Sequence, residues 1–346
     1  MGMRAWLAGL AVGSAAVAWR RAVRRARWLD LGGATVLVTG GSRGLGLLLA
    51  EEFGRHRARV ALCARDAAEL DRARTFLASR GIAALALACD VTDRARVDAT
   101  VREVEAQLGP IDVLVNNAGV ATVGPHATMT IEDYEEALAT HFWGPLYATL
   151  AVLPSMRRRR RGRIVNIASI GGKVSVPHLL PYSASKFALV GLSEGLRAEL
   201  LRHGVLVTTV CPGLMRTGSP RHARFKGRHR AEHAWFAISD SLPGLSMDAS
   251  RAARRIVEAC RRGEAEVVLS LPAKAAAAVH GVLPGLTADL LAVADRLLPR
   301  SGGIGTSSAR GADSASVAAP SWLTALGDRA ASRLNQLGAG ERRRPA

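Results

Sequence analysis

Short apolar runs alternate with longer amphipathic stretches through most of the chain. The apolar runs are rich in Val, Ile, Leu and Ala, as buried strands are, and the stretches between them repeat apolar residues at helical spacing. Strands that alternate with long helices form right-handed crossovers around a parallel sheet. We therefore expect an α/β fold, a doubly wound Rossmann-type parallel sheet of about seven strands with helices on both faces. The expected strands are residues 35–39, 60–64, 82–88, 111–115, 164–168, 205–211 and 266–271.

This alternation is confined to residues 32–271, which predicts one folded domain there. Residues 272–300 carry an Ala-rich stretch and an amphipathic one, separated by Pro284 and Gly285, so they predict a helical extension. That extension could pack on the domain, form a dimer contact or dip into a membrane. Residues 301–346 are rich in Gly, Ser and Ala over much of their length, and we expect this tail to be disordered.

Residues 1–31 form a separate N-terminal segment. No charge interrupts residues 5–19, while Arg4 precedes this run and several arginines follow it. As a helix the run would be about 22 Å long, short of a bilayer core of roughly 30 Å. A membrane anchor or surface helix is our first interpretation, a cleaved signal ending near Ala18 the second, and a packed soluble helix the third. The arginines favour a cytoplasmic position for the following domain, with a soluble cytoplasmic protein as the alternative.

The chain is strongly basic. Its net charge is +18, from 47 basic and 29 acidic residues, which suits anionic membranes, nucleic acids or anionic ligands. No nucleic-acid-binding motif or array of stacking aromatics accompanies the charge, so we expect no nucleic-acid partner. The four cysteines are far apart and predict buried free thiols in a reducing compartment. No metal-ligand cluster is found in the sequence.

A glycine-rich loop, TGGSRGLG at residues 39–46, lies between the first expected strand and a helix. Glycines let a phosphate approach the backbone, and the N–H groups that begin a helix face the anion. The order of strand, loop and helix therefore predicts a phosphate site, although the spacing G-x-x-x-G-x-G differs from the G-x-G-x-x-G fingerprint.

A second group of chemically capable residues comprises Ser169, Tyr182 and Lys186. Tyr182 and Lys186 are four residues apart on an expected helix and so lie on one face. A nearby ammonium group is expected to lower the pKa of the tyrosine and make it a proton donor or acceptor. Ser169 follows a strand, where it could bind the same substrate oxygen. The alternative is a packed ring beside a solvated charge.

Together these motifs resemble those of the short-chain dehydrogenase/reductase family, and the resemblance extends over residues 32–271. Two further motifs, N-N-A-G at 116–119 and P-G-x-x-x-T at 212–217, also resemble motifs of this family. The resemblance implies hydride transfer between a nicotinamide coenzyme and a carbonyl or alcohol. Tyr182 would be the general acid or base, Ser169 would hold the substrate oxygen, and Lys186 would lower the tyrosine pKa and bind the nicotinamide ribose. The coenzyme-binding residues that it implies are Gly40, Ser42, Arg43, Gly44, Leu45, Gly46, Arg65, Asp90, Val91, Asn117, Ala118, Gly119, Tyr182, Lys186, Pro212, Gly213 and Thr217.

Two arginines bear on the choice of coenzyme. Arg65 ends the second expected strand, where an acidic residue would favour NAD and a guanidinium would suit the 2′-phosphate of NADP. Arg43, inside the glycine loop, offers a second cation. Asp66 is adjacent, but with Glu69 it predicts a helix capping box. NADP(H) is therefore favoured over NAD(H).

Two features are less typical of the family. His141 stands where the family often has a catalytic asparagine; it could order a relay water, titrate near neutral pH, or be a packed residue in an impaired enzyme. Residues 218–245, at the position of the family's substrate lid, carry five basic residues and the pair Trp235–Phe236. They predict an acyl, phosphate-bearing or apolar substrate, or else a mobile arginine-rich loop.

The sequence thus predicts a membrane-associated NADP(H)-dependent oxidoreductase that interconverts a carbonyl and a primary or secondary alcohol on a small molecule, with a lipid-like or acyl compound among the candidate substrates. The intact Ser169, Tyr182 and Lys186 favour an enzyme. The alternatives are an inactive coenzyme-binding scaffold or sensor at a membrane surface, and a protein that only binds anionic surfaces. A homo-oligomer is possible.

Overall fold

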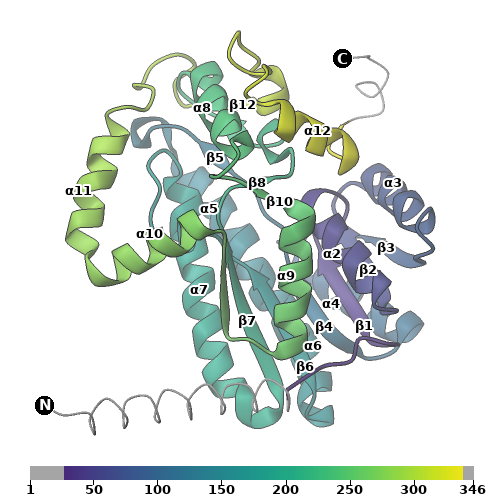
Figure 1. Cartoon of the computed structure of the whole chain (residues 1–346). Coiled ribbons are helices and arrows are strands. Elements are labelled where there is room, and N and C mark those ends of the chain that lie inside the picture. The colour runs from purple at the N-terminus through teal and green to yellow at the C-terminus, as the bar shows by residue number, and fades with distance from the viewer. Residues whose placement is uncertain (1–26, 338–346) are drawn as a thin grey trace, which may run out of the picture.

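A seven-stranded sheet forms the centre of the molecule (Figure 1). The computed structural model describes residues 27–337. All neighbouring strands in this sheet are parallel, in the order β11-β7-β6-β4-β1-β2-β3, which confirms the predicted fold class. The strands are β1 Thr35–Thr39, β2 Arg59–Ala64, β3 Ala84–Ala88, β4 Ile111–Asn116, β6 Gly162–Ile167, β7 Val205–Pro212 and β11 Glu266–Leu269.

Six helices cover the two faces of this sheet. On one face lie α2 Gly44–Arg55, α3 Ala67–Ala78 and α9 Ala249–Arg262, and on the other α4 Arg94–Leu108, α6 Gly144–Arg159 and α7 Leu180–Leu200. Central strands contact helices on both sides, so every residue of β1 is buried. Helix α2 packs against the sheet through fully buried Leu47, Leu49 and Phe53.

The strand order reverses between β1 and β4. From β1 the chain moves outward through β2 and β3, then returns to β4 and moves outward the other way through β6, β7 and β11. Loops that leave adjacent strands in opposite directions open a crevice at the carboxyl ends of those strands, where ligands bind in such folds. The glycine loop follows β1 and Asn117 follows β4, so both line this crevice.

Smaller elements surround the carboxyl edge of the sheet. Two sets of paired strands lie there: β8 with β10, and β5, β9 and β12. Their bounds and those of the remaining helices are β5 Thr122–Val123, η1 His126–Thr128, α5 Ile131–Leu138, η2 Ala139–Trp143, η3 Ile170–Gly172, η4 Leu201–His203, β8 Met215–Arg216, η5 Ser219–Arg221, β9 Arg224–Phe225, α8 His229–Ser241, β10 Met247–Asp248, α10 Leu271–Val282, α11 Pro284–Asp295, β12 Ala309–Arg310, η6 Gly311–Asp313 and α12 Ala325–Arg333.

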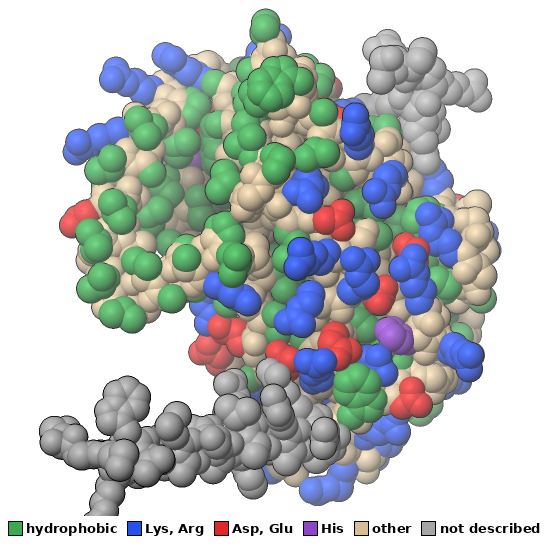
Figure 2. Space-filling model, in the orientation of Figure 1, with side chains coloured by type: hydrophobic (Ala, Val, Ile, Leu, Met, Phe, Trp, Pro, Cys, Tyr) green, Lys and Arg blue, Asp and Glu red, His purple; other side chains and the backbone are tan. Residues whose placement is uncertain are grey.

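The predicted helical extension is a pair of helices, α10 and α11, that separate at Pro284. Helix α11 is near the domain at His178, whose Nε2 lies 3.5 Å from Oδ1 of Asp295. Large apolar side chains cover much of the pair's outer surface, as the green side chains over α10 and α11 in Figure 2 show. Leu271 and Leu297 are 80% and 85% exposed.

The C-terminal tail differs from the prediction of disorder, because residues 301–337 are folded onto the domain. Strand β12 pairs with β9, and the N–H groups of Ile304 and Gly311 donate to the carbonyls of Gly227 and Ala223. Helix α12 packs against α8. The tail has few large apolar residues, but its backbone hydrogen bonds and the buried Ala331 and Leu334 stabilise it in place. Composition alone did not reveal these contacts.

Three other expectations concern particular segments. The apolar N-terminal run lies outside the described residues; within residues 27–337, no helix combines the length and apolarity that spanning a membrane needs. The sequence has a basic run, residues 157–161 and Arg163, that could form a solvated loop or lie on anionic lipid. Arg163 is instead buried and donates to the carbonyls of Cys260 and Arg27. All four cysteines are free and buried, as predicted.

Candidate active site

The glycine loop is held closely against the end of β4. Gly40 and Gly44 have φ of +63° and +56°, a region that favours glycine. A Cβ on Gly46 would lie 2.2 Å from the Gly40 carbonyl oxygen, so no larger residue fits there. Asn117 Nδ2 donates to the carbonyls of Thr39 and Gly40, at 3.1 and 3.0 Å. The loop is therefore fixed in shape with the first turn of α2 facing the crevice.

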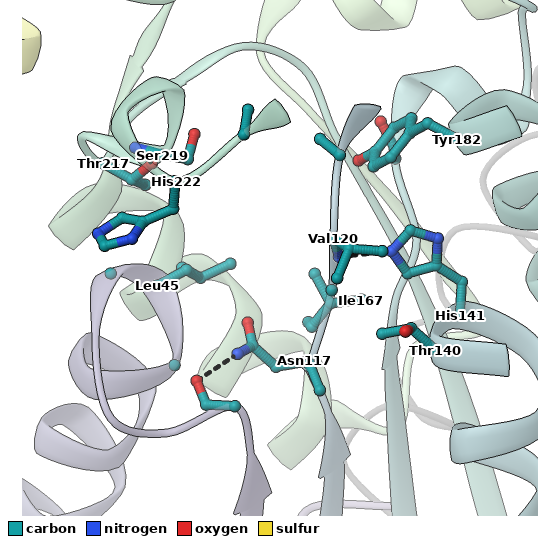
Figure 3. A pocket seen from close by; sticks show the side chains of 18 of the residues that line it. Leu45, Asn117, Val120, Thr140, His141, Ile167, Tyr182, Thr217, Ser219 and His222 are labelled. Atoms are coloured by element: carbon teal, nitrogen blue, oxygen red, sulfur yellow. Dashed lines mark hydrogen bonds between the residues drawn. The ribbon is translucent and has the colours of Figure 1, made fainter. Parts of the chain in front are cut away.

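A cavity of about 960 Å³ runs from the glycine loop to Tyr182. That volume is near the upper end of the roughly 300–1,000 Å³ usual for ligand pockets. Every residue predicted from the sequence as catalytic or coenzyme-binding lines it. In Figure 3, Leu45 and Thr217 lie on one side of the cavity and Tyr182 and His141 on the other. The structure thus brings the two groups of motifs into one site.

Ser169, Tyr182 and Lys186 converge at the end of β6. Ser169 lies two residues after the end of that strand. Its Oγ accepts the Gly171 N–H at 3.0 Å, and its side chain also hydrogen-bonds Tyr182. Lys186 lies one helical turn after Tyr182, with Nζ 5.6 Å from the centre of the tyrosine ring. Its Nζ donates to the Ile167 carbonyl at 2.8 Å, so the ammonium is anchored to the sheet.

The electrostatics of this group differ from the expectation. Burial raises the pKa of Tyr182, and its hydrogen bond with Ser169 opposes this only in part. Burial also lowers the pKa of Lys186 to about 7. The sequence argument considered the attraction between ammonium and phenolate but not the desolvation of both groups, which dominates at fully buried sites.

His141 is fully buried and both of its ring nitrogens have partners. Nε2 accepts the Val120 N–H at 3.1 Å (Figure 3), so Nδ1 carries the proton and donates to Ser185 Oγ at 2.8 Å. Ser185 in turn donates to the Tyr182 carbonyl. Burial, and then the Lys186 charge, lower the His141 pKa well below its usual value, so titration near neutral pH is not expected. The geometry therefore connects His141 through Ser185 to the Tyr182 backbone.

The two arginines differ in their surroundings. Arg43 Nη1 lies 2.5 Å from Glu69 Oε1, so its charge is already paired. Arg65 also lines the cavity, and no hydrogen bond or ion pair of its side chain is found within residues 27–337. Asp66 caps α3, as predicted, with Oδ1 accepting the Glu69 N–H at 2.8 Å. The Glu69 carboxylate does not complete the predicted capping box but accepts from Ser42 and Arg43. Arg65 is therefore the cation with greater freedom to meet a ligand.

The far end of the cavity is formed by the lid. Helix α8 occupies residues where the sequence indicated no clear periodicity, and it brings Trp235 and Phe236 to the cavity wall beside Leu179. Asp240 on the same helix is buried; its Oδ1 accepts the Met215 N–H at 3.0 Å, and Oδ2 has no hydrogen-bond partner among the described residues. Burial raises the pKa of this carboxyl to about 7. This end of the site thus combines apolar side chains with the buried carboxyl group of Asp240.

Among the residues that were not predicted are Asp240 and Gln336, which line the cavity, and Ser185, which bonds His141 and the Tyr182 carbonyl. Ser185 lies between Tyr182 and Lys186 in sequence, so its position beside the site could have been read from helical spacing. Asp240 lies on a helix with little amphipathic pattern, and Gln336 belongs to a tail whose composition indicated disorder. No local signal in the sequence singles out either residue.

Comparison with known proteins agrees with this geometry. The family model for short chain dehydrogenases matches residues 34–226, and the chain belongs to that family. The family implies NAD(P)(H) as coenzyme and a carbonyl or alcohol as substrate, so the protein is an oxidoreductase of this class.

Individual relatives carry different activities in their names. The chain is 37% identical to a gluconate 5-dehydrogenase of Gluconobacter oxydans over 188 residues, 54% of this chain and 73% of the relative. It is 34% identical to the ketoacyl reductase HetN of a Nostoc species over 241 residues, 69% of this chain and 79% of the relative. A crystal structure of a short-chain dehydrogenase from Streptomyces avermitilis is similar with a TM-score of 0.63 and 32% identity, covering 76% of this chain and 98% of that one.

The cavity fits a dinucleotide of this kind. The absence of a Cβ at Gly46, which would meet the Gly40 carbonyl, lets the loop fold closely onto the start of α2, where N–H groups can face a phosphate. Asp90 and Arg65 line the end of the cavity suited to adenosine, while Tyr182 and Lys186 line the end suited to nicotinamide. One continuous space therefore joins the glycine loop to Ser169, Tyr182 and Lys186.

Proposed function

We propose that the protein is an NADP(H)-dependent reductase or dehydrogenase that interconverts a carbonyl and an alcohol on an apolar or acyl substrate at a membrane surface. The observation that carries this proposal is the single cavity that joins the glycine loop and Arg65 to Ser169, Tyr182 and Lys186. The relatives' names include a polar substrate, gluconate, and less polar ketoacyl substrates. Trp235 and Phe236, in the segment proposed as the lid, favour the less polar kind of substrate for this chain.

The chain's own residues act on the substrate oxygen and its proton. When bound, the nicotinamide supplies or accepts the hydride. Ser169 Oγ is placed to donate a hydrogen bond to the substrate oxygen. Tyr182 gives that oxygen a proton during reduction, or takes one during oxidation. The raised pKa keeps its hydroxyl protonated, which suits the donor role, and Lys186 is placed to compensate charge that develops on the phenolate.

The preference for NADP(H) rests on Arg65. A guanidinium at the end of β2 can form charge-assisted hydrogen bonds with a 2′-phosphate. Arg43 contributes less in this proposal, because Glu69 holds its charge. Arg65 stands where an acidic residue would bind the ribose hydroxyls of NAD, and the carboxylate of the adjacent Asp66 caps α3 instead.

An apolar substrate is supported by the lid and by the surface around it. Trp235, Phe236 and Leu179 form the cavity wall beyond Tyr182. Burying an aliphatic chain against them contributes roughly 0.8 kcal/mol per methylene group. Asp240 is buried on the same helix as Trp235 and Phe236, and a neutral Asp240 could donate a hydrogen bond to a substrate oxygen.

Membrane association is supported by two separate apolar features. One is the uncharged sequence at residues 5–19, with arginines on both sides. The other is the exposed apolar side of α10 and α11, the latter lying near His178 at the substrate end of the domain. Exposed apolar patches of this kind are uncommon on soluble monomers. Both features suit a substrate that reaches the cavity from a lipid surface.

The test of the proposed activity is consumption of NADPH with a panel of ketones, aldehydes and 3-oxoacyl compounds. An active reductase oxidises NADPH only when a carbonyl compound is present. Coenzyme binding without turnover of any member of the panel, in either direction, would instead favour an inactive scaffold or sensor.

A further inference from the structure

The last described residues of the chain bind the glycine loop. We call residues 331–336 the C-terminal strap. The carbonyl of Leu334 accepts the Gly44 N–H at 2.9 Å. Asn335 Nδ2 donates to the carbonyls of Ser42 and Glu69, at 2.8 and 3.1 Å. Figure 1 shows the preceding helix α12, in yellow, above α2 and α3. A tail far away in sequence is thus attached to the loop on which a coenzyme phosphate would rest.

The strap is also attached to a second part of the cavity wall, the loop that follows β7. The His222 Nε2 and the Gln336 carbonyl oxygen are 3.0 Å apart, and His222 lines the cavity near Thr217. Ala331 packs so closely on Gly218 that a Cβ there would lie 2.4 Å from the alanine Cβ. On the first wall, Arg72 Nε donates to Asn335 Oδ1 at 3.0 Å. The strap therefore bridges the two loops that enclose the middle of the cavity.

Gln336 is the residue of the strap that lines the cavity itself. It is 5% exposed, and its Oε1 has no hydrogen-bond partner within residues 27–337. Its Nε2 lies over Gly44, the first residue of α2, and would be 2.8 Å from a Cβ if Gly44 carried one. A primary amide both donates and accepts hydrogen bonds, so it can donate to a phosphate oxygen and accept from a ribose hydroxyl.

We propose that the C-terminal strap is a wall of the coenzyme site, in which Asn335 fastens the strap to the glycine loop and Gln336 hydrogen-bonds the coenzyme near its pyrophosphate. This inference rests on the proposed function. The strap lines the cavity without dividing it, since the space from Arg65 to Tyr182 is continuous with the strap in place. The strap then lies over the bound coenzyme and slows its release.

Three single variants of the full-length protein test this. Asn335→Gly keeps the positive φ of 57° and removes the side-chain bonds to the loop. Gln336→Ala removes the direct contact. Ser332→Ala is the matched control, because its exposed hydroxyl bonds only the Arg329 carbonyl of its own helix. The dissociation constant for NADPH is measured by fluorescence titration and its dissociation rate by stopped flow, with thermal unfolding to verify folding.

For Asn335→Gly and for Gln336→Ala we expect about tenfold weaker NADPH binding and faster NADPH release, because each loses the contribution of one or two hydrogen bonds. The control stays at the wild-type value. Both variants within twofold of wild type would overturn the inference, and so would tighter binding, which would make the strap an obstruction. If the wild-type protein binds neither NADPH nor NADH, the proposed function fails and the inference with it.

Discussion

His141 shows how a single residue can sit at a family's catalytic position with a different set of contacts. Its hydrogen bonds run from Val120 through the ring to Ser185 and then to the Tyr182 carbonyl. We infer that His141 positions the start of α7 and is not a proton carrier.

His141→Ala should therefore lower turnover about tenfold or more and destabilise the fold, because it leaves the Val120 N–H without its partner at a cost of roughly 1–3 kcal/mol. His141→Asn offers an oxygen and an amide and should recover part of both. Steady-state kinetics and denaturant unfolding measure the two effects. Wild-type turnover and stability in His141→Ala would show that the hydrogen bonds are dispensable.

Arg65 and Arg43 should contribute unequally to coenzyme choice. Arg65→Ala should weaken NADPH binding about tenfold or more, since charged hydrogen bonds contribute roughly 1.5–3 kcal/mol, and should leave NADH binding nearly unchanged. Arg43→Ala should have a smaller effect, because Glu69 pairs with its guanidinium. Titration of each variant with both coenzymes measures this. Equal losses for NADPH and NADH would assign Arg65 to the fold instead.

Asp240 should make stability depend on pH. Burial raises its pKa from 3.8 to about 7, so the folded state holds a proton that the unfolded chain releases at lower pH. Its contribution to stability is therefore full below about pH 4 and falls as pH rises toward 7. Asp240→Asn keeps the acceptor for Met215 and removes the titration.

The stability of Asp240→Asn relative to wild type should thus improve by more than ~1 kcal/mol between pH 5 and pH 8. Denaturant unfolding at the two values measures it. A constant difference between the two proteins would mean that Asp240 is ionised in the fold.

At the scale of elements, the sequence predicted what depends on local pattern. The seven strands of the sheet have continuous apolar runs, and each was expected within about two residues of its position. The glycine loop and the Tyr182–Lys186 turn were found because their chemistry requires fixed spacing. Asp66 was recognised as a cap for the same reason.

The elements that were missed depend on distant contacts. Helix α8 is buried on several sides, against β8, β9 and η5 and against α12 of the tail, so its apolar positions show no simple helical period. The C-terminal segment is stabilised by backbone hydrogen bonds to residues far away in the sequence, such as the one from Ile304 to Gly227. Hydrogen bonds between backbone atoms cannot be inferred from amino-acid composition. The pKa of Tyr182 was misjudged because burial is a property of the folded chain.

For the whole molecule, we predict binding to anionic vesicles. Arginines near the surface contribute about 1 kcal/mol each, and exposed leucines of α10 and α11 can enter the interface. Deleting residues 1–25 should release a good part of the protein while preserving the domain, because Arg27, whose carbonyl accepts from Arg163, is retained. Flotation on a density gradient measures this.

A charged substitution on α11 tests the second contact separately. Leu290→Glu, at a position 57% exposed, should weaken flotation further in the shortened protein. Leu150→Glu on α6, 47% exposed, is the matched control and should not. Full-length protein that stays wholly out of the vesicle fraction at low salt would contradict the membrane proposal.

The central claim is that Tyr182 transfers a proton in a carbonyl–alcohol reaction. Its most direct test compares wild type and Tyr182→Phe for NADPH oxidation with the best carbonyl substrate, alongside NADPH binding by each protein. The phenylalanine keeps the ring and removes the proton, so binding should persist while turnover falls about 100-fold or more. Turnover near the wild-type rate in Tyr182→Phe, with coenzyme still bound, would contradict the account.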